Sequence, residues 1–181
     1  YLPYAGTQLW SSNFLPGCYQ GTRIVAGPEP IPDLARTSPS LQIEQMELGL
    51  LDRFNRRHQQ YHSGNPALAA RIKSFETAFG MQQQMPEALD LSKETDATLA
   101  LYGLERGSTK GFAWQCLMAR RLVERGVRFV ELIDTGSSDN WDSHGDMHDH
   151  IPLARNVDRP IAGLLRDLKA RGLLDDTLIV W

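Results

Sequence analysis

The segment from residue 139 to residue 150, DNWDSHGDMHDH, gathers side chains that could do chemistry, because it contains three of the five histidines and four aspartates. Asp142 and His144 are two residues apart, so in an extended segment both side chains point to the same side. A carboxylate oxygen and an imidazole nitrogen in this arrangement can share Zn²⁺ or a similar divalent ion. Gly145 allows the backbone to turn tightly after them. Asp142 and His144 are therefore the main candidates for a metal site, and the spacing leaves open whether the ion is Zn, Ca, Mg or Mn.

Two further histidines of this segment, His148 and His150, are secondary candidates. They fall where a helix is expected to begin, and capping or solvent exposure explains them equally well. Two ligands do not complete a site, since structural zinc sites have about four protein ligands and catalytic sites about three. The remaining ligands must come from elsewhere. The alternative is that the Asp and His side chains only solvate a long loop.

A second histidine pair, His58 and His62, is spaced i, i+4, which places both rings on one face of a helix. That spacing can bind a metal, but Gln59 and Gln60 stand where metalloprotease-type motifs carry an acid. We therefore interpret this pair as part of a solvated helix face.

We call residues 139–150 the Asp/His segment. The elements expected before and after it predict where it lies in the fold. Residues 127–134, VRFVELID, are rich in β-branched and apolar side chains and indicate a buried strand. A helix is expected over 151–171, with Asp149 as its N-cap and Gly172 after its end. The run TLIVW at 177–181 indicates a second buried strand. This order predicts a right-handed crossover between parallel strands, with the Asp/His segment at the carboxyl end of the first, where ligands gather.

The chain before residue 126 is expected to be mostly helical after a loop region. Residues 1–40 are rich in Pro and Gly and predict a loop packing on the core. The segment 41–106, a possible inserted subdomain, contains apolar residues at helical spacing, interrupted by a break at Pro86. Residues 107–181 form the predicted α/β core portion.

Within these parts, helices are expected over 40–62, 66–84 and 109–125. Residues 90–107 are expected to be a polar connector with a short apolar patch. In the third helix, the spacing predicts that Arg120 and Arg121 point outward.

The composition narrows the classes of partner. The chain has 181 residues, 41% of them hydrophobic and 23% charged, which fits a soluble globular protein. A net charge of -3 gives no electrostatic reason to expect nucleic acid as a partner. No apolar run approaches the ~18 residues of a membrane span. The two cysteines, Cys18 and Cys116, form no zinc or redox motif and leave the compartment open.

Four stretches carry a resemblance to a known family. They are CLMARRLVERGVRFVELIDTG, the continuous run from Trp141 to Trp181 beginning WDSHG and ending RGLLDDTLIVW, SSNFLPGCYQGTRI, and DATLALYGLERG. Together they closely resemble the domain-of-unknown-function family 1501, whose members look like sulfatases of the alkaline phosphatase superfamily. Because the N-terminal and C-terminal motifs of that family are missing here, the chain is expected to be an internal fragment.

The resemblance implies an α/β sandwich, incomplete at both ends, with parallel strands and covering helices. It also implies a divalent-metal-dependent hydrolase of sulfate or phosphate esters, on a small molecule or a polysaccharide. Asp142 and His144 match the family's Trp-Asp-x-His-Gly motif. A periplasmic or extracytoplasmic location is implied for the parent protein. The alternative is a non-catalytic relative that acts as a binding or assembly module.

No catalytic residue is assigned from the sequence. Ser137 and Ser138 lie in the same loop, but they lack the glycine pattern of a nucleophile elbow and are interpreted as turn residues. The fragment alone is therefore predicted to turn over no sulfate or phosphate ester.

Overall fold

The computed structural model describes residues 11–16, 19–32, 34–35, 37–62, 64–134 and 141–181. The chain divides into two compact units. Among the described residues, unit 1 comprises Val25–Pro30 and Glu87–Trp181, and unit 2 comprises the residues up to Ile24 together with Ile31–Pro86. The Asp/His segment belongs to unit 1.

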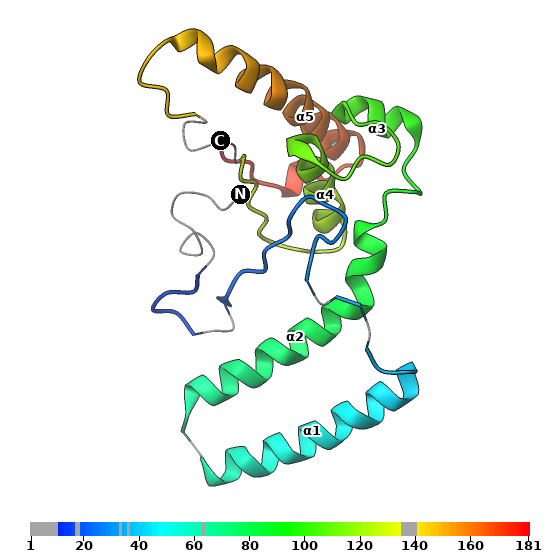
Figure 1. Ribbon diagram of the computed structural model, residues 1–181, viewed down its shortest axis with the longest axis vertical. Coiled ribbons are helices and arrows are strands. Elements are labelled where there is room, and N and C mark those ends of the chain that lie inside the picture. Colours follow the sequence, from blue (N-terminus) through cyan, green and yellow to red (C-terminus); the bar gives the residue numbers. More distant parts are fainter. Residues whose placement is uncertain (1–10, 17–18, 33, 36, 63, 135–140) are drawn as a thin grey trace. The chain divides into compact units, whose positions relative to one another are not determined.

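Unit 1 is a small helical assembly. Its main helices are α3 (Asp96–Tyr102), α4 (Gly111–Glu124) and α5 (His150–Ala170), with short 3-10 turns η3 (Met147–Asp149) and η4 (Leu174–Asp176) at the two ends of α5. Helix α5 packs against both α3 and α4 (Figure 1). The core between them consists of Leu99, Tyr102, Trp114, Cys116, Leu117, Met118, Val157 and Leu168. This core contacts α5 from Val157 onward, whereas the first turns of α5, which follow the Asp/His segment, are exposed or half-buried.

The predicted α/β sandwich is wrong. The part of the chain that the structure describes contains no strand, and both 127–134 and 177–181 lack regular secondary structure. Many of their side chains are open to solvent, with Phe129 82% and Trp181 87% exposed, while Val130, Leu132 and Ile133 are half-buried. A β-branched run gains stability only on a pleated surface whose neighbouring strand takes up its N–H and C=O groups. These two segments form no such ladder, so composition alone did not make them strands.

Four of the predicted helices are confirmed. The first is α1 (Leu41–Tyr61), whose N-cap Ser40 accepts a hydrogen bond from the Ile43 N–H at 3.3 Å. The second is α2 (Pro66–Leu89), which continues through Pro86, where a break was expected. Pro86 has no N–H to donate within the helix, and α2 ends three residues later at Leu89. The helices expected over 109–125 and 151–171 are α4 and α5.

The expected polar connector over 90–107 contains a helix that the periodicity did not reveal. Helix α3 is only seven residues long, too short for an apolar repeat to be recognised. Its signals are local. Thr95 caps it by accepting from the Thr98 N–H at 3.1 Å, and Gly103 ends it in the left-handed conformation with φ 78°.

The crossing of α3 and α5 requires a glycine. A Cβ atom on Gly163 of α5 would lie 2.8 Å from the Leu101 carbonyl oxygen of α3. That distance is below any normal contact, so the two backbones approach closely only because position 163 has no side chain.

Among the described residues, no helix is long and apolar enough to cross a membrane.

Candidate functional site

Asp142 and His144 lie next to each other in the structure, as their spacing predicts. The His144 Nε2 atom is 3.0 Å from the Asp142 Oδ1 atom, and the two side chains are 87% and 80% exposed. Two ligands of one tetrahedral zinc ion, each about 2.0–2.1 Å from the metal, lie about 3.3 Å apart. The observed separation is that of a direct contact between the two groups, and a shared ion would need the two atoms only a few tenths of an ångström farther apart. The donor types also fit, since imidazole and carboxylate both bind Zn²⁺ and related ions.

A second pair of the same kind follows four residues later. The His148 Nδ1 atom is 2.7 Å from Asp146 Oδ1, which also accepts from the His148 backbone N–H at 2.9 Å. These bonds from His148 lower the pKa of Asp146. Asp146 thus caps the η3 turn, and this pair has a structural reason to exist without a metal.

His150 is held in a way that does not suit a metal ligand. Its Nε2 atom faces the Trp141 carbonyl oxygen at 3.0 Å, and its Nδ1 atom faces the Met147 carbonyl oxygen at 3.3 Å. Carbonyl oxygens are acceptors, so the ring nitrogen that carries a proton donates to the backbone, and both nitrogens are directed at the protein's own main chain. His150 therefore fixes the entrance of α5.

Trp141 contacts one residue before it in the sequence, Asp134, and one after it, His150. Its indole N–H donates to Asp134 Oδ2 at 2.9 Å, and its ring is tilted against that of His150 with the centroids 6.1 Å apart. Trp141 is 40% exposed, so it is not a core tryptophan. Its contacts hold the backbone immediately before Asp142.

The structure does not bring the other candidates into the site. Across the described ranges, no group of three or more His, Cys, Asp or Glu side chains could hold a metal ion. The expected cap Asp149 makes no side-chain cap bond to α5, and instead accepts from Ser143 Oγ at 3.2 Å. Ser137 and Ser138 lie outside the described residues. The metal assignment of Asp142 and His144 stays a prediction.

A buried cluster of charges in unit 1 escaped the sequence analysis. The prediction that Arg120 and Arg121 point outward is wrong, because they are only 2% and 6% exposed. Arg120 contacts carboxylates on three segments: Glu94 at 2.8 Å, Glu124 at 2.6 Å and Asp167 at 3.0 Å. The N–H groups facing Glu94 and Asp167 are not aligned for hydrogen bonds, so these two contacts are held by charge.

The other members of the cluster complete its charge balance. Arg121 pairs with Glu94 and donates to the Ala88 carbonyl oxygen at 2.7 Å. Arg171 contacts Asp167 and Glu124, each at 2.7 Å, and the Tyr102 hydroxyl donates to Asp167 at 2.9 Å. Three guanidinium groups thus face three carboxylates.

The pKa values of the cluster favour this charged state. Burial acts to raise the pKa of Glu94, but its contacts with the positively charged Arg120 and Arg121 outweigh this effect and lower the pKa. Burial, and then the Asp167 charge, raise the pKa of Tyr102, which keeps its proton to donate. Every member is engaged by another, which is typical of a structural network. One feature of the sequence could have indicated the buried cluster, namely the adjacent pair Arg120 and Arg121 inside a mainly apolar helix.

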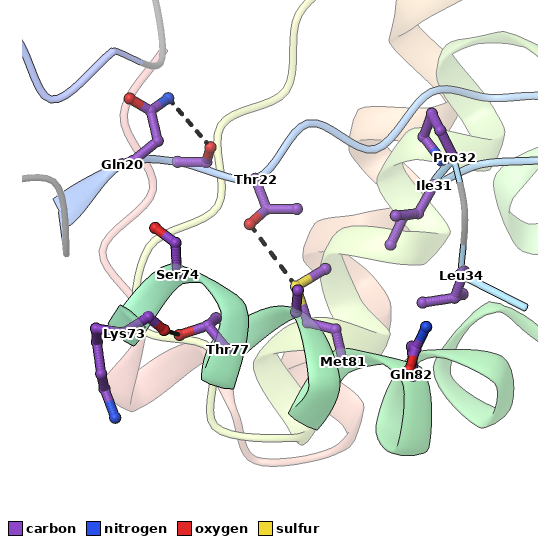
Figure 2. Close-up of a pocket in the computed structure, with 12 residues that line it drawn as sticks. Gln20, Thr22, Ile31, Pro32, Leu34, Lys73, Ser74, Thr77, Met81 and Gln82 are labelled. Carbon is purple, nitrogen blue, oxygen red and sulfur yellow. Dashed lines mark hydrogen bonds between the residues drawn. The ribbon is translucent and has the colours of Figure 1, made fainter. Parts of the chain in front are cut away.

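Unit 2 contains a recess separate from the Asp/His segment. Its volume is about 270 Å³, near the lower end of small-molecule sites. It lies between α2 and the loop segments 20–22 and 31–34 (Figure 2). The Thr77 hydroxyl donates to the Lys73 carbonyl oxygen at 2.9 Å, and the Thr22 hydroxyl lies 3.8 Å from the Met81 sulfur. The Lys73 side chain extends away from the recess (Figure 2), so none of the described residues that line it directs a charge into it.

The comparisons decide the family. A family model described as "Protein of unknown function (DUF1501)" matches residues 2–181. The chain belongs to the DUF1501 family. No curated protein and no solved structure matches it. For this DUF1501 chain, the family resemblance drawn from the WDSHG motif and the RGLLDDTLIVW ending is confirmed at the level of the family.

Proposed function

We propose that this DUF1501 chain is part of a sulfatase-like, metal-dependent hydrolase of sulfate or phosphate esters. The observation that supports the proposal best is the 3.0 Å approach of His144 Nε2 to Asp142 Oδ1 on an exposed segment. Both side chains are open to solvent, so an ion and an anionic ester can reach them. The bound ion would neutralise charge on the ester oxygens.

In this proposal the two side chains have distinct tasks. Asp142 supplies negative charge to the ion, and His144 supplies a neutral nitrogen lone pair. Trp141 holds the backbone before them through its bond to Asp134. The remaining ligands and the nucleophile come from a longer parent protein, located outside the cytoplasm. A polysaccharide ester or a small ester is the substrate class.

The first prediction concerns metal binding. In the parent protein, Asp142→Ala and His144→Ala each lower the affinity for Zn²⁺ or Mn²⁺ by at least about 10-fold, because each removes a ligand. Titration calorimetry and elemental analysis give the affinity and the stoichiometry. Lowering the pH weakens binding of the unaltered protein, because protonated imidazole has no lone pair for a metal.

His58→Ala is the matched control, because it removes an imidazole from a helix of unit 2 and leaves the Asp/His segment intact. It keeps the wild-type affinity. If Asp142→Ala and His144→Ala also keep the wild-type stoichiometry and affinity, the segment is a solvated turn and the proposal fails.

Activity separates the hydrolase from the alternative of a non-catalytic binding or assembly module. The parent protein is expected to hydrolyse an aryl sulfate or an aryl phosphate, and His144→Ala to abolish this, whereas the isolated chain turns over neither. A parent that binds metal through Asp142 and His144 but hydrolyses no ester would support the binding module instead.

A further inference from the structure

Helix α1 of unit 2 exposes the apolar side that a surface helix normally buries. Ile43, Met46, Leu50, Phe54 and Tyr61 recur every three, four or seven residues and so form one stripe along the helix. Met46 is 69% exposed, Phe54 59% and Tyr61 73%. We call these five residues the α1 stripe.

The opposite side of α1 is the covered one, although it is mainly polar, with the half-buried Leu48 among its residues. Glu44 is only 7% exposed, and Asp52, Asn55 and Gln59 are half-buried at the same helical spacing. Within the described part of the chain, nothing covers the side chains of the α1 stripe, which are between 42% and 73% exposed. The α1 stripe therefore lacks the partner that its pattern requires.

We propose that the α1 stripe is a self-association surface, and that its occupant is α1 of a second copy of this chain in antiparallel orientation. The charge pattern of the helix favours this occupant. Among the residues that flank the α1 stripe, the acidic Glu47 lies in the first half of α1 and the basic Arg53 and Arg57 lie in the second half. Antiparallel pairing places the acidic half of each helix beside the basic half of the other, whereas parallel pairing places like charges together.

A two-fold axis near the level of Asp52 gives a consistent register. Ile43 then lies opposite Tyr61 of the second copy, and Leu50 opposite its Phe54, as an isologous interface demands. Glu47 lies opposite Arg57 of the second copy. Glu47 also accepts from Ser38 Oγ at 2.7 Å, and a carboxylate has lone pairs for a further donor.

The exposed area of the α1 stripe is also consistent with a protein–protein interface. Together with Leu51 beside it, the α1 stripe exposes roughly 600–700 Å² of mainly apolar side chain, judged from the exposed fractions and the full areas of such side chains. This exceeds the few hundred Å² that a monomer normally exposes in one patch, and approaches the ~800 Å² per partner of a standard interface.

Sedimentation of the 181-residue chain from about 1 to about 200 µM tests the proposal. The wild-type chain is expected to show a monomer–dimer equilibrium, and Phe54→Glu to raise its dissociation constant at least about 10-fold. Phe75→Glu is the matched control. Phe75 lies on α2, is exposed to a similar extent at 66%, and is outside the α1 stripe. This variant keeps the wild-type constant.

A charge exchange tests the orientation independently of the apolar contacts. Glu47→Arg alone and Arg57→Glu alone each weaken the dimer, and the double variant restores it, because opposite charges face each other again. Failure of the double variant to restore association overturns the antiparallel pairing. A wild-type chain that stays monomeric at 200 µM, or a dimer that Phe54→Glu leaves unchanged, overturns self-association. The α1 stripe is then covered by another segment of a longer protein or by a different partner.

Discussion

At the scale of single residues, Arg120 shows how a buried charge is tolerated in unit 1. Its guanidinium is almost fully removed from water, yet carboxylates of Glu94, Glu124 and Asp167 lie within 3.0 Å. Desolvating a charge is costly, and the pairing offsets that cost only while all partners are present. A large effect is therefore expected when one member is removed.

Arg120→Met is predicted to destabilise the chain by about 3–5 kcal/mol, because it leaves buried carboxylates without their main counter-charge. Urea unfolding followed by far-UV circular dichroism measures the change. The control is Arg56→Met, which removes an exposed pair with Asp52 whose side chains are 74% and 46% exposed. It leaves the unfolding midpoint unchanged. If Arg56→Met lowers the free energy of unfolding as much as Arg120→Met does, the buried cluster stabilises the chain no more than an exposed ion pair.

At the scale of elements, the crossing of α3 and α5 depends on Gly163. In most helices, replacing Gly by Ala gains up to about 1 kcal/mol from the lower entropy of the unfolded chain. At position 163 the added methyl group meets the Leu101 carbonyl oxygen at 2.8 Å. The oxygen belongs to a rigid helix backbone, so the clash outweighs the propensity.

Gly163→Ala is accordingly predicted to destabilise unit 1 by about 1–3 kcal/mol. Gly80→Ala in α2 is the matched control, because nothing lies within 4 Å of the added carbon. It is expected to raise the melting temperature slightly. A stabilised Gly163→Ala variant would mean that α3 and α5 are farther apart than described.

The elements also show what the sequence could predict and why. The helices α1, α2, α4 and α5 were predictable because their apolar repeats and caps are local properties of the chain. The prediction of strands over 127–134 and 177–181 was wrong, because a strand depends on a neighbour that no local pattern specifies. The burial of Arg120 could not be predicted for the same reason, because its carboxylate partners Glu94 and Asp167 are distant in sequence.

For the candidate site, the sequence placed Asp142 and His144 together correctly, since two-residue spacing in an extended segment is also local. It could not predict that His150 turns both ring nitrogens to backbone carbonyls. That orientation depends on how Trp141 packs against the start of α5.

At the scale of the whole molecule, the buried charges make stability depend on acidity. The pKa of Glu94 is lowered from 4.5 in the folded chain, because Arg120 and Arg121 outweigh the effect of burial. A lowered folded pKa means that the stabilisation is fully present above about pH 4.5 and is lost as the pH falls through the folded pKa.

The free energy of unfolding is thus predicted to fall as the pH is lowered below about 4.5. Glu94→Gln is less stable at pH 7 and shows a shallower acid dependence, because position 94 no longer binds a proton. Unfolding midpoints in urea at pH 7, 5, 4 and 3 measure both. If the wild-type chain and Glu94→Gln lose stability equally over this pH range, Glu94 is not the source of the acid dependence.

The order in which the chain is synthesised gives the exposed side of α1 another consequence. The buried apolar side chains of α3, α4 and α5 lie between Leu99 and Leu168, so that core closes through nearby contacts and is expected to fold in milliseconds or less. Leu50 leaves the ribosome well before Leu168, and at 5–20 residues per second the interval is about 6–24 s. During that time α1 presents Met46, Leu50 and Phe54 on a nascent chain whose helical core does not yet exist. Chaperones that bind short apolar stretches would meet α1 first, and the yield of folded protein would depend on how soon a second copy, or another cover, replaces them.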